Sequence, residues 1–233
     1  MKPVLRIPES RHLTTFMYDP IVFDLDGTLT DSKQGIIAGI QYALKKEGLP
    51  PFDAEQITTH IGGPLREVIC KHHGLEDLAA TRLITRFRDY YRRIGIYENR
   101  LFPGVKELLE TLHQQGRQLA IATAKPTQSA QIVLELFRIA NLFEVVSGSD
   151  TSSGRDTKTA ILRHALQELA TSDSAKAVMI GDRCYDIKAA HDNGIESIGL
   201  AHGYGTMKEL REAGATHTID NTEVLRRLLW AGS

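Results

Sequence analysis

Short apolar runs alternate with segments of helical periodicity along most of the chain. Apolar residues three and four positions apart predict helices over Val105–Gln115, Pro126–Ala140, Thr157–Ala170 and Tyr185–Asn193. The apolar runs predict strands at Ile21–Leu25, Leu119–Thr123, Glu144–Ser147, Ala177–Ile180 and Ser197–Leu200. Their nearly continuous apolar character is typical of strands that are buried on both faces. The alternation therefore predicts an α/β fold in which helices cover both faces of a parallel sheet.

Residues 33–100 follow a different pattern and contain no strand-like apolar run. Proline and glycine pairs divide this region into predicted amphipathic helices over Ile36–Glu47, Pro64–His73 and Leu78–Ile94. We interpret 33–100 as an α-helical domain inserted into an α/β core that consists of residues 19–32 and 101–233. Residues 1–18 are expected to form a loose N-terminal extension, with Met17 as an alternative start. Residues 1–16 carry several charges and lack the apolar core of a secretory signal.

Composition and charge exclude several classes of function. The chain is 42% hydrophobic and 24% charged, which is ordinary for a soluble globular protein. Its net charge of -1 provides no basic field for nucleic acid or membranes, and no run approaches the roughly 20 apolar residues of a membrane span. Cys70 and Cys184 form no CxxC pair, so we expect a reducing, cytoplasmic location. A zinc site at Cys70, His72 and His73 is disfavoured because no second ligand pair lies nearby.

The first predicted strand delivers two carboxylates, Asp24 and Asp26, to a turn at Gly27-Thr28. In a parallel sheet such a strand end lies at the edge where ligands bind. A carboxylate at Asp24 can attack phosphorus to form an aspartyl-phosphate, or it can hold a hard cation such as Mg2+ through oxygen. Asp26 is placed to protonate the departing alkoxide and then to deprotonate the hydrolytic water. The competing interpretation is a strand that ends in a solvated acidic turn.

Three further segments carry candidate chemistry to the same edge. Thr123, Ala124 and Lys125 follow a strand and precede a helix whose N-terminal amides can bind phosphate oxygens. Lys125 either adds charge to the site or is solvated. Lys158 either neutralises phosphoryl oxygens and keeps Asp24 ionised, or is an exposed lysine in a first helical turn. Arg155 has the same ambiguity and is left outside the core site.

The last of these segments is Gly181-Asp182, with Asp186 four residues after Asp182. Together with Asp24 these residues supply three carboxylates for one hard cation. Mg2+ prefers six oxygen ligands and retains several waters. We therefore expect Asp182 to bind Mg2+ directly and Asp186 to bind through water or to orient the other ligands.

Taken together, these segments resemble the haloacid dehalogenase superfamily. The run from Asp24 to Ser32 matches its first motif, and Thr123, Lys158 and Gly181-Asp182-x3-Asp186 match the second, third and fourth in order and spacing. The resemblance covers about residues 19–230. It implies a Rossmann-like core, with residues 33–100 as a small helical cap. It also implies a metal site made by the Asp24 carboxylate, the Asp26 backbone carbonyl and Asp182.

The residues separate the chemistries found in this superfamily. Dehalogenases and phosphonate hydrolases resemble the same fold but lack an acid at the position of Asp26, which argues against both. Sugar phosphomutases of the beta-phosphoglucomutase type keep both acids and remain an alternative. A non-catalytic phospho-ligand-binding protein is a further alternative, although such a member would be expected to lose Asp24, Asp26, Lys158 or Asp182.

Among phosphatases the chain looks most like phosphoglycolate phosphatase, with 5'-nucleotidase and pyrophosphatase as alternatives. The cues are Thr30-Asp31-Ser32, Ile61-Gly62-Gly63-Pro64-Leu65 and Gly203-Tyr204-Gly205. We expect Gly27, Thr28, Ala124 and Lys125 to contact substrate. Arg66 is a candidate for binding a substrate carboxylate or second phosphate, against the alternative of an exposed helical arginine. The expected partner is a small phosphorylated metabolite, bound by a monomer or homodimer.

Overall fold

A six-stranded parallel sheet forms the centre of the computed structural model, which describes residues 18–63, 65–169 and 176–230. The strand order is β5-β4-β1-β6-β7-β8, so the first strand of the chain lies inside the sheet. The strands are β1 (Ile21–Phe23), β4 (Leu119–Pro126), β5 (Val145–Ser149), β6 (Val178–Gly181), β7 (Glu196–Leu200) and β8 (His217–Ile219). This arrangement confirms the predicted α/β class.

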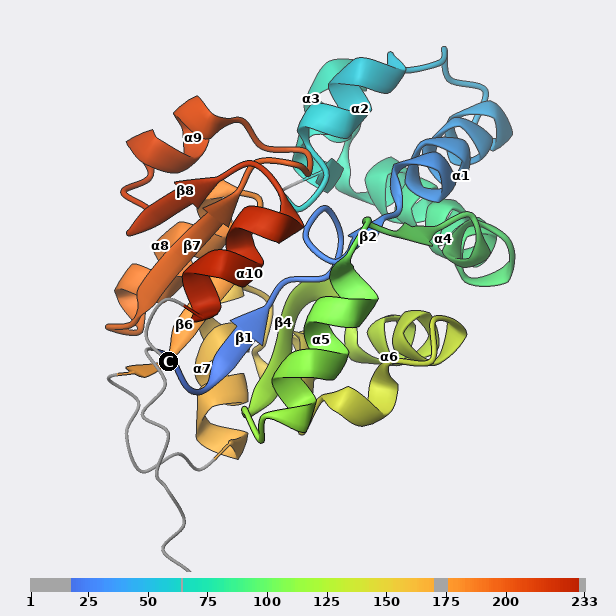
Figure 1. Cartoon of the computed structure of the whole chain (residues 1–233). Helices are drawn as coiled ribbons and strands as arrows, with labels where there is room; N and C mark the ends of the chain where they lie inside the picture. The colour runs from blue at the N-terminus through green and yellow to red at the C-terminus, as the bar shows by residue number, and fades with distance from the viewer. Residues whose placement is uncertain (1–17, 64, 170–175, 231–233) are drawn as a thin grey trace, which may run out of the picture.

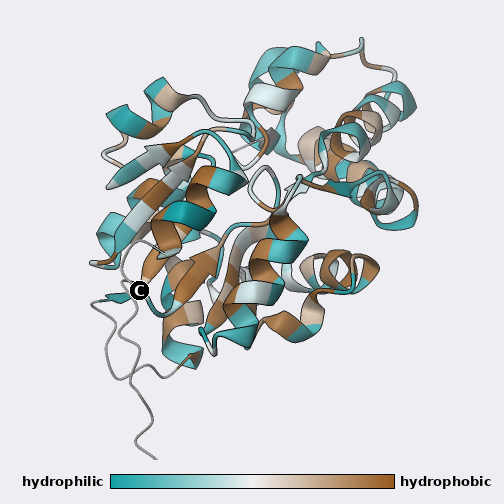
Figure 2. Ribbon diagram, in the orientation of Figure 1, coloured by the Kyte–Doolittle hydropathy of each residue, from teal (hydrophilic) through white to brown (hydrophobic). Residues whose placement is uncertain are grey.

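Successive residues of the central strand point to opposite faces of the sheet, and each face has its own apolar core. Ile21 and Phe23 belong to one buried cluster and Val22 to the other. The first cluster is covered by α5 (Val105–Gln114), α6 (Thr127–Leu136) and α10 (Thr222–Trp230). The second is covered by α7 (Lys158–Glu168) and α8 (Cys184–Asp192). Figure 1 shows α5 and α10 in front of the sheet, and Figure 2 shows apolar residues concentrated on the strands.

The register of the sheet sets the positions of the candidate side chains. Phe23 lies opposite Ile121 of β4 and Ile180 of β6. Because these strands are parallel and in register, Asp24, Thr123 and Asp182, which follow these three positions by one or two residues, lie toward the same edge of the sheet, where the polar segments were expected to meet.

Four helices gather beyond that edge, at one end of the molecule (Figure 1). They are α1 (Lys33–Lys46), α2 (Ala54–Thr59), α3 (Leu65–His73) and α4 (Asp77–Arg93). The chain enters this group through β2 (Thr30–Asp31) and returns through β3 (Arg100–Leu101), which pair antiparallel. Near the return, a Cβ atom on Gly35 would lie 1.9 Å from the carbonyl oxygen of Gly95, so glycine allows α1 to pack closely against this segment.

Several predicted boundaries differ from the structure. The helix expected over Pro126–Ala140 spans only Thr127–Leu136. It begins one residue later because Pro126 still belongs to β4, and it ends earlier, before a short 3-10 turn that begins at Ala140. The sequence pattern also did not predict β8, α2, α9 (Met207–Glu212), α10 and the β2–β3 pair, none of which is longer than nine residues. Residues 1–17 and Pro64 lie outside the described residues. Tyr18, assigned to the extension, is buried and donates a hydrogen bond to Glu196 (2.6 Å).

None of the helices in the described part of the chain is long and apolar enough to cross a membrane.

Candidate active site

The end of β1 positions both carboxylates of the first motif. The Asp24 amide donates a hydrogen bond to the carbonyl of Ile180 (2.9 Å), so the backbone at Asp24 is still tied to β6. Asp24 and Asp26 are both buried. The turn then passes through Gly27 with φ of 89°, where a Cβ atom would lie 2.2 Å from a carboxylate oxygen of Asp182. Glycine is therefore required here by both backbone conformation and space.

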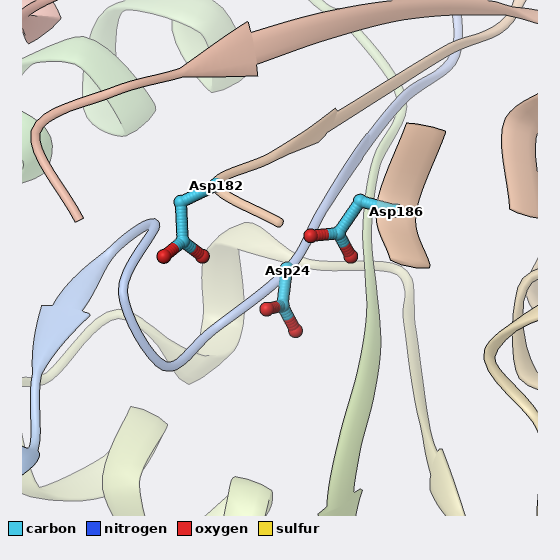
Figure 3. A group of neighbouring side chains, drawn as sticks. All are labelled: Asp24, Asp182 and Asp186. Atoms are coloured by element: carbon cyan, nitrogen blue, oxygen red, sulfur yellow. The ribbon is translucent and has the colours of Figure 1, made fainter. Parts of the chain in front are cut away.

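Three buried carboxylates converge beside this turn. Asp24, Asp182 at the end of β6 and Asp186 in the first turn of α8 point toward one another (Figure 3). Each offers one oxygen atom, and these atoms all lie within 4.8 Å of one another. This is the only group of three or more potential metal ligands that occurs within residues 18–63, 65–169 and 176–230. The donors are all hard oxygen atoms, so the group fits a divalent cation such as Mg2+.

Two buried lysines oppose the acidic groups. Lys158 Nζ lies 2.6 Å from Asp24 Oδ1 and 2.8 Å from Asp186 Oδ1. Lys125 Nζ lies 2.8 Å from Asp26 Oδ2. Both lysines are therefore buried and ion-paired rather than solvated. Asp26 Oδ1 is buried and has no hydrogen-bond partner among the described residues, which leaves it able to exchange a proton with a bound molecule.

The site holds more negative than positive charge. The four carboxylates of Asp24, Asp26, Asp182 and Asp186 face only two ammonium groups. Burial raises the pKa of Asp24 to about 6, although Lys158 opposes the shift. Burial, followed by the charges of Asp186 and Asp24, raises the pKa of Asp182 well above its usual range. A bound divalent cation would neutralise this surplus, which is an electrostatic reason to expect one.

Thr123 lies in β4, is buried, and accepts a hydrogen bond from the amide of Lys125 (3.3 Å). The following segment crosses Gly148, where a Cβ atom would lie 2.5 Å from the Lys125 carbonyl oxygen. Ala124 is exposed at this bend. The register of β4 against β5 shifts between Thr123 and Pro126, and Lys125 lies in this irregular stretch with its ammonium group paired to Asp26.

The family model described as haloacid dehalogenase-like hydrolase matches residues 21–200. The chain belongs to this family. It is 35% identical over 212 residues to a 5'-nucleotidase from Pseudomonas aeruginosa, covering 91% of this chain and 96% of the relative. It is 32% identical over 217 residues to a phosphoglycolate phosphatase from Aliivibrio fischeri, covering 90% and 95%.

The crystal structure of a predicted phosphatase from Clostridium acetobutylicum has the same fold. It is similar with a TM-score of 0.85 and 34% identity, covering 92% of this chain and 99% of that one. These matches confirm the predicted membership of the superfamily and the predicted enzyme class, a phosphatase of the haloacid dehalogenase-like family.

Within this haloacid dehalogenase-like site, Thr28 contacts a carboxylate. Its hydroxyl is fully buried and donates to Asp182 Oδ1 (3.1 Å), while the amide of Tyr204 donates to Asp182 Oδ2 (2.7 Å). Gly203 and Gly205 permit this approach, because a Cβ atom on Gly205 would lie 1.9 Å from the Asp182 carbonyl oxygen. The Gly-Tyr-Gly sequence was used above only as a family cue, but its backbone also holds the carboxylate of Asp182 in place.

Arg183 links the edge of the sheet that carries Asp182 to the helical group α1–α4. The sequence analysis did not single out this residue. It is buried, donates from Nε to Glu209 (2.9 Å), and donates from Nη1 to the carbonyl of Ile61. The neighbouring Gly63 lies against the ring of Tyr185, where a Cβ atom would be 2.6 Å from a ring carbon. The Ile61-Gly62-Gly63 turn thus packs against the segment that contains Asp182 and Asp186.

Two candidate arginines lie apart from the acidic cluster. Arg66 is exposed on α3 and its recorded ion pair is with Asp77 (3.6 Å). Arg155 forms an ion pair with Asp150 (3.2 Å). In the described residues the disfavoured zinc group at Cys70, His72 and His73 does not form a metal-ligating cluster.

Proposed function

We propose that this chain is a Mg2+-dependent phosphatase that hydrolyses a small phosphomonoester through an aspartyl-phosphate on Asp24. The observation that carries the proposal is that two carboxylates from one strand end have different surroundings. Asp24 lies in the three-carboxylate cluster and against Lys158, whereas Asp26 lies outside the cluster and against Lys125. This separation supports a role for Asp24 beside the phosphoryl group and the cation, and a role for Asp26 beside the leaving group.

The first half-reaction is an in-line displacement at phosphorus. A carboxylate oxygen of Asp24 forms a bond to phosphorus as the bond from phosphorus to the ester oxygen breaks. Asp26 donates a proton to that departing oxygen. Lys158 and the Thr123 hydroxyl hold the phosphoryl oxygens. The Lys158 ammonium, 2.6 Å away, also favours the ionised form of Asp24 that attack requires.

The second half-reaction releases inorganic phosphate. Asp26, now ionised, accepts a proton from water as that water attacks phosphorus and the bond to Asp24 breaks. The carboxylates of Asp24, Asp182 and Asp186 and the backbone carbonyl of Asp26 are the residues that would hold Mg2+. When bound, the cation offsets the negative charge of the phosphoryl group and of these acids.

The helices α1–α4 are proposed to act as a cap that covers the leaving group and excludes water. We propose two candidate activities, phosphoglycolate phosphatase and 5'-nucleotidase. The relatives named for each activity are similar to about nine tenths of this chain. A cytoplasmic location and a monomer or homodimer without nucleic-acid partners complete the proposal.

Release of inorganic phosphate from a substrate panel tests this function. The panel contains 2-phosphoglycolate, nucleoside monophosphates, pyrophosphate and hexose phosphates, each with Mg2+ or with EDTA. We expect Mg2+-dependent release that Asp24→Asn abolishes and that Asp220→Asn, an exposed site after β8, leaves unchanged. Turnover by Asp24→Asn above a few per cent of wild type would overturn the mechanism. Silence across the panel would favour a phosphomutase or a ligand-binding role.

A further inference from the structure

A tyrosine from the helical group reaches the proton-transferring acid through a lysine. The hydroxyl of Tyr91, in α4, accepts a hydrogen bond from Lys125 Nζ (2.7 Å). The same Nζ lies 2.8 Å from Asp26 Oδ2. The three residues are far apart in sequence and come from three separate elements. Tyr91 is at the C-terminal end of α4, Lys125 is at the end of β4, and Asp26 follows β1.

The three side chains are enclosed and closely packed. Tyr91 is 7% exposed, and Lys125 and Asp26 are each 8% exposed. Lys125 Nζ also lies 4.4 Å from the centre of the Tyr91 ring, close enough for a cation–π attraction. The ring also packs against Phe87, at a centroid distance of 5.6 Å, and against Gly95. The hydroxyl of Tyr91 therefore has little freedom to move away from Lys125.

This arrangement fixes one oxygen of Asp26 and leaves the other for chemistry. Lysine has a flexible four-carbon stem, so one acceptor alone would define its ammonium group poorly. The Tyr91 hydroxyl provides a second acceptor and holds the ammonium on Asp26 Oδ2. Asp26 Oδ1, buried and without a hydrogen-bond partner in the described residues, is then the oxygen that faces the leaving group.

We propose that Tyr91 is a positioning residue that orients Asp26 through Lys125, an inference that rests on the proposed phosphatase function. Tyr91 and Lys125 keep their protons throughout, and the transferred proton moves only between Asp26 and the leaving oxygen or water. Because Tyr91 belongs to the helical group, Asp26 is held in its working orientation only while α4 lies against the sheet edge. Proton transfer is thereby restricted to the arrangement in which Tyr91 of α4 contacts Lys125.

The test is the dependence of kcat/KM on the leaving group in Tyr91→Phe. This quantity reports the first half-reaction, in which Asp26 protonates the ester oxygen. An alkyl phosphate needs that proton, whereas p-nitrophenyl phosphate releases an anion that is stable without it. Since general acid catalysis contributes about 10²–10⁴-fold, imperfect positioning should lower kcat/KM for the alkyl ester roughly tenfold. The value for p-nitrophenyl phosphate should change little.

Tyr90→Phe is the matched control. It removes the same hydroxyl from the neighbouring residue, whose ring packs on Tyr42 at 5.0 Å instead, and it should leave both substrates unaffected. Lys125→Met is the second variant, and should steepen the leaving-group dependence at least as much as Tyr91→Phe. Because Tyr91 acts through Lys125, adding Tyr91→Phe to Lys125→Met should cause no further loss.

Three results would overturn the inference. One is an equal loss for both substrates in Tyr91→Phe, which would indicate a general structural role. Another is independent, multiplicative losses in the double variant. If Tyr91→Phe does not fold, as judged by thermal melting, an unchanged leaving-group dependence in Lys125→Met would overturn it. Failure of the phosphatase proposal is distinct, because wild type would then release phosphate from neither ester.

Discussion

Replacing Asp182 by asparagine should stabilise the metal-free protein while removing its response to Mg2+. The substitution keeps the shape of the side chain and can keep its hydrogen bonds. The amide oxygen can accept from the Tyr204 amide, and the amide nitrogen can donate to the Thr28 hydroxyl, which accepts as readily as it donates. The main change is therefore the loss of one buried negative charge.

The expected gain follows from the charges that surround this position. Asp182 faces the carboxylates of Asp24 and Asp186, both within 4.8 Å, and Lys158 neutralises one of these two charges. One net negative charge at about that distance repels Asp182 by about 3 kcal/mol at an effective dielectric constant of 20. Partial protonation of the wild-type cluster reduces this figure, so we expect a gain of about 1–3 kcal/mol. For a protein of this size, a gain of this magnitude corresponds to a melting temperature higher by roughly 2–12 °C.

The sign of the pH dependence provides a second measurement. The folded-state pKa of Asp182 is raised above its usual value, and that of Asp24 is raised from 3.8 to about 6. The folded protein therefore binds more protons than the unfolded chain in this window, and metal-free wild type loses stability as the pH rises through it. Asp182→Asn removes part of this loss. The difference in melting temperature should be small near pH 4 and largest above pH 7.

Thermal melting in EDTA and in excess Mg2+ tests the predicted effect of Asp182→Asn on stability, with Asp220→Asn as the control. Wild type should gain about 2.7 kcal/mol when free Mg2+ is 100 times its dissociation constant, and the variant much less. The difference in melting temperature between Asp182→Asn and wild type should therefore shrink or change sign when Mg2+ is added. A lower melting temperature of Asp182→Asn in EDTA at pH 7.5, or an undiminished response to Mg2+, would refute the electrostatic argument.

Two further substitutions test separate parts of the site. Asp26→Asn should slow turnover by about 10²–10⁴-fold by removing the proton carrier, without reducing Mg2+-induced stabilisation; rapid-quench trapping of phosphoenzyme measures the first effect, and normal turnover would contradict it. Gly27→Ala should destabilise far more than Gly48→Ala. Both glycines have positive φ (89° and 70°), but a Cβ atom would strike Asp182 at Gly27 and meet nothing within 4 Å at Gly48. Equal losses in denaturant unfolding would show that contact with Asp182 adds nothing.

The sequence predicted the sheet and its chemically active edge because both depend on local patterns. Buried parallel strands are continuous apolar runs, so Ile21–Phe23 and Val178–Gly181 were recognisable, as were the acids that follow them. The edge strand β8 was not predicted because only Ile219 of its three residues is buried. Helix α2 was not predicted for a similar reason. Ile57 is its single buried residue, and one apolar position cannot show a helical period.

The contacts that complete the site were not predictable in this way. Whether Lys125 was solvated or active depended on its pairing with Asp26 and Tyr91, and neither residue is near it in sequence. The contact of Arg183 with Ile61 crosses 122 residues. Such pairings are fixed by how strands and helices pack, and no local periodicity records them. Glycine is a partial exception, because a positive φ beside a motif acid, as at Gly27, indicates a close approach even when the partner is unknown.

The surplus of negative charge links the fold to the proposed chemistry. A buried carboxylate cluster that lacks its cation weakens the folded state, and an apolar replacement would be tolerated better. Lys158 reduces the repulsion, but it contacts Asp24 and Asp186 and leaves Asp182 with backbone and hydroxyl donors alone. Asp182 thus makes no direct ion pair within the described residues, and the charge of Arg183 acts on it more weakly than the two neighbouring carboxylates do. We therefore expect Asp182 to make the largest contribution to Mg2+ affinity, because it has the most repulsion to lose when the cation binds.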